Sequence, residues 1–173
     1  MPLVRMVTIT AAVAACAACA ATDPAPEALR VGDADEAVVR RVVDGDTLIA
    51  RIDGRDERVR MLGVDAPESV AENRPVECYG PQASARAKAL LPKGARVLLA
   101  SDPSQGARDR YGRLLAEVSL PGETRTVNER LVAEGYAEVF RGDGRGRLQP
   151  RLRAAERAAR DARLGLWSAC RRR

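Results

Sequence analysis

The sequence predicts an α+β fold in which five β-strands form a small barrel and three α-helices pack beside it. Three observations support this fold class: short β-branched segments separated by turn residues, three segments with a helical spacing of apolar residues, and the order in which these segments occur. A chain of 173 residues has room for one domain of ordinary size and a short appendage.

The strand segments are short, and turn residues separate them. We expect the strands at residues 37–43, 46–52, 57–64, 96–100 and 113–120. Asp53-Gly54 predicts a two-residue hairpin turn between the second and third strands, because both residues tolerate the positive φ angles of such a turn.

The helical segments carry start and stop signals. We expect helices at residues 79–91, 126–135 and 150–165. Pro81 suits the first turn of the first helix, and Thr126 with Glu129 forms a capping box at the start of the second. Three strands, a helix, two strands and two helices is the order of a five-stranded OB-fold barrel with three α-helices.

The first 21 residues are typical of an export signal. Arg5 precedes an apolar run that is too short to span a bilayer. Residues 13–16 resemble a bacterial lipobox, in which Cys16 would be lipidated and would anchor the protein to a membrane. The alternative is cleavage at an Ala-x-Ala-like site and free secretion. In both cases we expect an exported protein, either a cell-envelope lipoprotein or a secreted one.

The remaining boundaries follow from composition and from the two cysteines that lie beyond the signal. Residues 22–36 are polar and contain proline, as a flexible tether would; we place the folded domain at 37–170 and a basic tail at 171–173. Because export leads to an oxidising compartment, we predict a disulfide between Cys78 and Cys170. The alternative is two unpaired buried cysteines.

Composition restricts the chemistry. The net charge is +5, and only Lys88 and Lys93 among the 29 basic residues are lysines. Arginine favours bidentate contact with phosphate, although a GC-rich coding bias would produce the same excess. The sequence has no histidine. Catalytic triads, Cys-His pairs and most zinc sites are therefore excluded, and carboxylates, arginines and a hard metal ion remain.

Two clusters combine carboxylates with strand ends. Asp44-Gly45-Asp46-Thr47 lies between the first two strands, where paired carboxylates suit calcium or magnesium; taken alone, it is more often a simple turn. In the second cluster, Arg60 lies on a strand that is apolar on both faces and needs nearby anions, which Asp65 and Glu68 would supply. A purely structural ion pair is the alternative interpretation of this second cluster.

The third cluster is Asp109-Arg110-Tyr111-Gly112-Arg113, a turn that leads into the fifth strand. Alone, it is typical of a solvated basic loop. Together and in this order, the three clusters resemble the thermonuclease family, the staphylococcal-nuclease-like domain. The resemblance covers residues 37–170 and includes three further motifs: Tyr79-Gly80-Pro81-Gln82-Ala83-Ser84, Val127-Asn128-Glu129 and Gly165-Leu166-Trp167.

The resemblance implies a calcium site. Asp46 and Asp65 match the family's calcium carboxylates, and Ala66 matches a position that contributes its backbone carbonyl. Family members often have threonine at that position, so a hydroxyl is missing here, but a main-chain ligand does not depend on the side chain. Asp44 and Thr47 match outer-shell positions.

The resemblance also implies catalytic and substrate-binding roles. Glu68 matches the general base, and Arg60 and Arg113 match the pair that grips the scissile phosphate. DNA and RNA would both be substrates, and the products would carry 3′-phosphates. The positions expected to bind the neighbouring nucleotide are Arg110, Tyr111 and Arg141, the last in place of a family tyrosine.

Two other function classes compete with an active monomeric nuclease. One is a non-catalytic nucleic-acid-binding OB module on the cell envelope, and the other is an envelope lipoprotein whose barrel makes protein contacts. The intact carboxylates and arginines at every position that matches the family's site argue against both alternatives.

Overall fold

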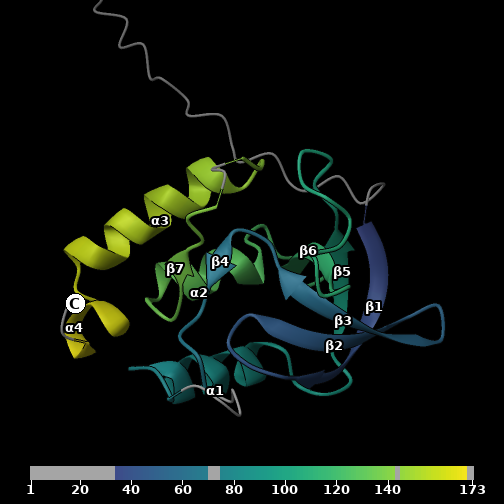
Figure 1. Ribbon diagram of the computed structural model, residues 1–173, viewed down its shortest axis with the longest axis horizontal. Helices are drawn as coiled ribbons and strands as arrows, with labels where there is room; N and C mark the ends of the chain where they lie inside the picture. Colours follow the sequence, from purple (N-terminus) through teal and green to yellow (C-terminus); the bar gives the residue numbers. More distant parts are fainter. Residues whose placement is uncertain (1–33, 70–74, 143–144, 171–173) are drawn as a thin grey trace, which may run out of the picture.

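Five strands form a closed barrel in the computed structural model, which describes residues 34–69, 75–142 and 145–170 (Figure 1). The strands are β1 (Ala34–Val42), β2 (Thr47–Ile52), β3 (Arg55–Met61), β5 (Arg96–Ala100) and β6 (Leu114–Ser119). Their order is β1-β2-β3-β6-β5, and the antiparallel pairing of β1 with β5 closes the barrel. Only β3 and β6 pair in parallel within this barrel. The predicted five-stranded OB-type barrel is therefore confirmed.

Local sequence signals explain the first hairpin and the barrel core. Asp53 and Gly54 have φ angles of 47° and 80°, as the predicted two-residue turn requires, and β2 pairs with β3 from Thr47–Arg60 to Ile52–Arg55. Side chains that alternate along the strands fill the interior, among them Val39, Leu48, Val59, Val97 and Val118. β1 begins at Ala34, so the last three residues assigned to the tether belong to the barrel.

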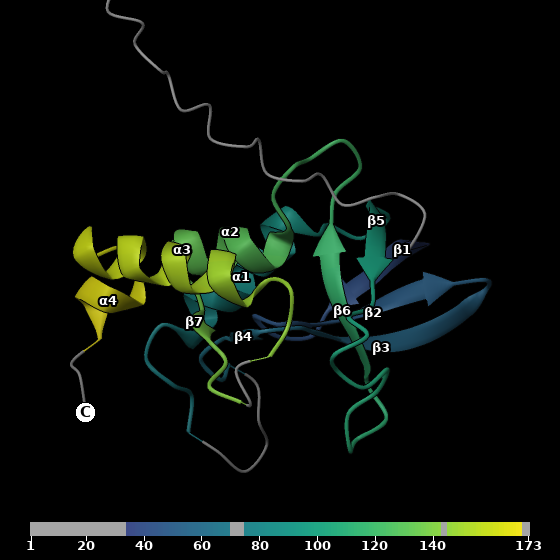
Figure 2. The ribbon, with the colours of Figure 1, turned by 90° about the horizontal axis from the view of Figure 1, so that it is seen from above.

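The helices gather on one side of the barrel (Figures 1 and 2). They are α1 (Gly80–Leu90), α2 (Val127–Ala133), α3 (Gln149–Asp161) and the four-residue α4 (Leu166–Ala169). The capping box at the start of α2 is present, because Thr126 Oγ1 accepts from the NH of Glu129 and the Glu129 carboxylate accepts from the NH of Thr126. α2 packs between β6 and α3. Within the described residues no helix is long and apolar enough to cross a membrane.

A second, two-stranded sheet was not expected from the sequence. The predicted third strand at 57–64 is interrupted after Met61, because Gly63 adopts a φ of 73°, and the chain resumes as β4 (Val64–Asp65). β4 pairs antiparallel with β7 (Glu138–Val139), which lies beside α3. Strands of two residues are too short to show an alternating pattern. This small sheet carries Asp65 away from the barrel wall and towards the helices.

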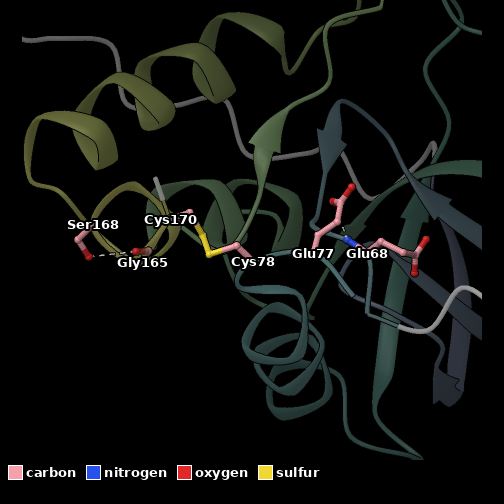
Figure 3. The surroundings of a disulfide bond; sticks show 6 residues. All are labelled: Glu68, Glu77, Cys78, Gly165, Ser168 and Cys170. Atoms are coloured by element: carbon pink, nitrogen blue, oxygen red, sulfur yellow. Dashed lines mark hydrogen bonds between the residues drawn. A yellow bond between two sulfur atoms is a disulfide. The ribbon is translucent and has the colours of Figure 1, made fainter. Parts of the chain in front are cut away.

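The disulfide between Cys78 and Cys170 is present, as predicted (Figure 3). It joins the residues just before α1 to the end of α4, across a sequence separation of 92 residues. Cys16, the signal segment, the tether up to residue 33 and the basic tail lie outside the described residues.

Candidate active site

The turn between β1 and β2 brings two carboxylates to the edge of the barrel. Asp44 Oδ1 accepts a hydrogen bond from the NH of Asp46 at 3.0 Å, which closes the turn locally. Gly45 is required because a Cβ there would lie 2.5 Å from the Cβ of Ala66. The missing side chain therefore allows the turn to lie directly against the segment that follows β4.

Asp46 is buried and held by donors on three sides. Its Oδ1 accepts from the hydroxyl of Thr47 at 3.0 Å, and its Oδ2 accepts from the NH of Ala66 at 2.8 Å. Arg60 Nη1 forms an ion pair with the same Oδ2. These contacts fix the orientation of the carboxylate, a prerequisite for a preorganised ligand.

Arg60 links the two carboxylates that the sequence singled out. It lies on β3 opposite Thr47, and its side chain is only 14% exposed. Arg60 Nη2 donates to Asp65 Oδ1 at 3.2 Å, while Nη1 contacts Asp46. Burial lowers the pKa of Arg60, and the charges of Asp65 and Asp44 oppose this shift. The predicted inward orientation of Arg60 is thus observed, with anions on both sides of the guanidinium.

The cluster is electrostatically suited to a further cation. Burial raises the pKa of Asp44, although the Thr47 hydroxyl and the charge of Arg60 act to lower it. Burial disfavours the charged form of this carboxylate, and a nearby cation would favour that form.

The donor set fits a hard divalent metal. Among residues 34–69, 75–142 and 145–170, no three acidic or cysteine side chains already converge around one metal position. Asp46 and Asp65 nevertheless share one positive partner, because Nη1 of Arg60 contacts Asp46 and Nη2 of Arg60 contacts Asp65. Oxygen ligands of this kind suit calcium or magnesium. Asp46, Asp65 and the carbonyl of Ala66 are the groups that would hold such an ion.

Glu68 is positioned through its backbone by the residues before α1 (Figure 3). Its NH donates to Glu77 Oε2 at 3.0 Å, and its carbonyl accepts from the NH of Glu77 at 2.9 Å. Gly80 at the start of α1 permits this contact, since a Cβ there would lie 2.3 Å from the Glu68 carbonyl oxygen. The Tyr79-Gly80-Pro81 motif therefore both starts helix α1 and allows the backbone of Glu68 to lie against the beginning of that helix.

Arg60 and Arg113 line one open cleft of about 640 Å³. Arg113 precedes β6, and its Nε donates to Asp109 Oδ2 at 2.6 Å. Asp109 also accepts from the backbone NH groups of Tyr111 and Arg113, which shapes the turn. Arg110 lies over the ring of Tyr111 at 4.7 Å, and both line the cleft. The second and third sequence clusters thus meet at this cleft.

Arg141 is the one predicted substrate-binding residue that does not line this cleft. It is 81% exposed and comes no closer than 3.9 Å to Glu138. The neighbouring Phe140 lines the cleft instead and is 50% exposed. From the sequence, Phe140 and Glu77 were not expected at the site, and Asp109 was part of the third cluster without a role of its own. Only Asp109 carried a recognisable signal, its i, i+4 spacing from Arg113.

Comparison with known proteins identifies the family. Residues 58–169 match the family model described as Staphylococcal nuclease homologue, which covers more than half of the chain. The chain belongs to this staphylococcal nuclease family. It is 34% identical over 166 residues to a Thermonuclease of Staphylococcus hyicus, which covers 94% of this chain and 95% of the relative.

Two further relatives are similar over most of the chain. A Thermonuclease of Staphylococcus intermedius is 40% identical over 130 residues, 75% of this chain and 74% of the relative. The Endonuclease YncB of Bacillus subtilis is 37% identical over 129 residues, 74% of this chain and 59% of the relative. The family and its barrel fold are therefore established from sequence similarity and from structure together.

Proposed function

We propose that this protein is a calcium-dependent nuclease that hydrolyses phosphodiester bonds of DNA and RNA and leaves 3′-phosphate ends. Its class as a nuclease, and hence a hydrolase, follows from its family and its named relatives. The single observation that carries the finer proposal is the position of Arg60. This residue contacts Asp46 and Asp65 and also lines the cleft that contains Arg113.

The proposed cofactor is Ca²⁺, held by Asp46, Asp65 and the carbonyl of Ala66, with Asp44 and Thr47 in the outer shell. The Thr47 hydroxyl already orients Asp46, which is the work of an outer-shell group. A bound calcium ion would supply electrostatic stabilisation for negative charge that develops on the phosphoryl oxygens.

The proposed catalytic residues are Glu68, Arg60 and Arg113. Hydrolysis builds charge on the phosphoryl oxygens, which two preorganised guanidinium groups are suited to stabilise. Asp109 holds the Nε of Arg113, so the outer nitrogens of that guanidinium are the ones left to face a phosphate. Glu68 would accept the proton of the attacking water, and breakage of the bond to the 5′ oxygen would leave the 3′-phosphate.

Substrate binding is assigned to Arg110, Tyr111 and Arg141, with Arg110 and Tyr111 forming a stacked pair at the cleft. No step requires a 2′-hydroxyl, so DNA and RNA are both expected substrates. We further propose that the protein is exported and acts as a monomer, either secreted or anchored through a lipid on Cys16. The disulfide between Cys78 and Cys170 is consistent with an oxidising compartment.

One experiment tests the activity. The chain from Thr22 onward is incubated with plasmid DNA and with RNA, in calcium and in a chelator, and cleavage and product ends are analysed. We expect cleavage only with calcium. A Glu68→Gln variant should retain the fold and calcium binding but lose most of the rate. Binding of nucleic acid without cleavage in any metal would instead support the non-catalytic OB module.

A further inference from the structure

A second groove adjoins the active-site cleft and is not part of the proposed catalytic machinery. It has a volume of about 340 Å³ and is lined by residues of the β7 end and of α3. Phe140 and Gly142 line both the groove and the cleft, so the two hollows meet at these residues. A ligand that leaves the cleft over Phe140 would enter the groove directly.

Three arginines give this groove its charge: Arg141, Arg153 and Arg157. Arg153 and Arg157 are four residues apart on α3, so they lie on one helix face, and both are exposed. Within the described part of the chain, neither forms an ion pair with an acidic side chain, whereas most other arginines of the domain do.

The acidic residue of the groove is already engaged elsewhere. Glu156 Oε1 accepts from the NH of Val139 at 3.0 Å and pairs with Arg160 at 3.3 Å. Its charge therefore fixes α3 against β7 instead of neutralising Arg153 and Arg157. The result is a concentration of positive charge in which only Arg141 has an acidic neighbour, Glu138 at 3.9 Å, and such an excess of charge is an expected property of a surface that binds phosphates.

Phe140 forms an aromatic ridge between the two hollows. Its ring lies so close to Gly142 that a Cβ at residue 142 would be 2.5 Å from Cε1 of the ring. Glycine at this position therefore lets the ring lie against the backbone. An aromatic face that is half exposed and supported from below is suited to stack with a nucleobase.

We infer that this groove extends the substrate-binding surface, with a nucleobase stacked on Phe140 and the adjacent backbone phosphates bound by Arg141, Arg153 and Arg157. The inference rests on the proposed nuclease function and deepens it by naming residues that would bind the strand beyond the cleft. A base reaches the face of Phe140 only when it is unstacked, so a single strand longer than a dinucleotide is the probe for this groove.

An anionic membrane surface is the main competitor for such a basic patch. The structure favours nucleic acid because the charge lies in a groove continuous with the cleft, beside an aromatic ridge, and not on an open convex face. This distinction is testable because the two partners respond differently to the same substitutions.

The test compares two double variants of equal charge change. Arg153→Gln with Arg157→Gln alters the groove, whereas Arg55→Gln with Arg58→Gln alters exposed arginines of β3, in the hairpin that lies far from α3 in both views (Figures 1 and 2). With calcium, the groove variant should have about a tenfold higher KM for a 20-nucleotide single strand, from two lost phosphate contacts. Cleavage of a dinucleotide should be unchanged, and the control variant should match the wild type on both substrates.

Salt dependence and direct binding complete the test. For the same strand, the slope of log(kcat/KM) against log[KCl] should become shallower by about 1.4 in the groove variant, since each contact with a single strand contributes about 0.7. Phe140→Ala should weaken binding of the strand by about tenfold or more, with Phe140→Tyr close to the wild type. Binding is measured by fluorescence anisotropy with chelator present, so it reports on the groove even if cleavage fails.

Two results would overturn the inference. One is equal binding and equal KM for the groove and control variants on the 20-nucleotide strand. The other is loss of binding to vesicles with anionic lipid in the groove variant while its behaviour towards the strand stays that of the wild type. Absence of cleavage by the wild-type protein, with the groove variant still impaired in binding, would contradict the nuclease proposal alone.

Discussion

Glu77 and Glu68 are joined by two hydrogen bonds (Figure 3). The Glu77 carboxylate accepts from the backbone NH of Glu68 at 3.0 Å, and the backbone NH of Glu77 donates to the Glu68 carbonyl at 2.9 Å. Cys78 follows Glu77 directly and is bonded to Cys170. The disulfide therefore restrains the segment that positions the proposed general base. If Glu68 is the general base, loss of the disulfide is expected to affect both stability and catalysis.

Removal of the disulfide should affect both properties. For Cys78→Ala with Cys170→Ala, we expect the free energy of unfolding to fall by about 4–5 kcal/mol, because the bond closes a loop of about ninety residues. Turnover under native conditions should also fall, since Glu77 gains freedom to release Glu68. Urea unfolding and kcat are measured with and without dithiothreitol. The double variant should not respond to the reductant, and a wild type that is equally unresponsive would contradict the expectation.

Arg60→Gln should separate metal binding from catalysis. The guanidinium lies against Asp46 and Asp65, so its removal eliminates a positive charge beside the proposed metal ligands and should increase calcium affinity several-fold. The rate should nevertheless fall by about two to three orders of magnitude, because a group that stabilises the phosphoryl charge is lost. Calorimetry with Ca²⁺ and steady-state rates provide the two measurements. The exposed Arg58→Gln serves as control, and weaker calcium binding by the Arg60 variant would refute this account of the site.

Asn128→Ala should be strongly destabilising although the residue is remote from the cleft. The buried amide accepts from the NH of Val118 at 2.9 Å and donates to the carbonyl of Leu62 at 2.8 Å, so it joins β6 to the bend after β3. Alanine would leave two buried backbone groups unpaired, which costs about 2–4 kcal/mol in total. Thermal and urea unfolding measure the loss. The exposed Lys93→Ala should change stability by less than about 0.5 kcal/mol.

The barrel was predictable because its signals are local. The Asp53-Gly54 turn, the capping box of Thr126 and Glu129, and the proline at the start of α1 each specify a backbone conformation without help from distant residues. β4 and β7 were not predictable. Each has two residues, and their pairing depends on the bend at Gly63 and on the packing of α3, which are tertiary effects.

The candidate site could likewise be predicted only in part. Arg60 was predicted to need anions because a buried guanidinium is costly when unpaired, and Asp65 and Glu68 were expected to supply them. The structure pairs Arg60 with Asp65, as expected, and also with Asp46, which was not expected. Glu77 was missed because its role arises from its contact with Glu68 across a loop, and Phe140 because its place in the lining of the cleft depends on how distant segments pack together. No spacing in the sequence encodes those contacts. Arg141 matches a binding position in sequence, but its side chain lies in the neighbouring groove.

Acid should destabilise the fold below about pH 4, and Asp102 is one cause. Burial acts to raise the pKa of this carboxyl, but donors from the Ser104 hydroxyl, from the NH of Arg147 and from the NH of Ser104 outweigh it, so the pKa is lowered. A carboxyl whose pKa is lower in the folded state than in the unfolded state stabilises the fold when the pH is above its unfolded-state pKa of about 3.9. This stabilisation is lost as the pH falls through the folded-state pKa. The contribution of Asp102 to the free energy of unfolding should therefore be fully present above about pH 5 and decrease below about pH 4.

Glu117 has the opposite effect on the pH dependence of stability, and a substitution of Asp102 separates the contributions of the two carboxyls. Burial raises its pKa despite the ion pair with Arg147, so its contribution is unfavourable above about pH 4.5, and protonation partly offsets the loss at Asp102. Asp102→Asn should lower stability at pH 7 by about 1–2 kcal/mol and make the decline below pH 4 shallower. Urea unfolding from pH 3 to 7 tests this, with the exposed Asp35→Asn as control. If the free energy of unfolding falls as steeply below pH 4 in the Asp102 variant as in the wild type, other carboxylates cause the loss of stability in acid.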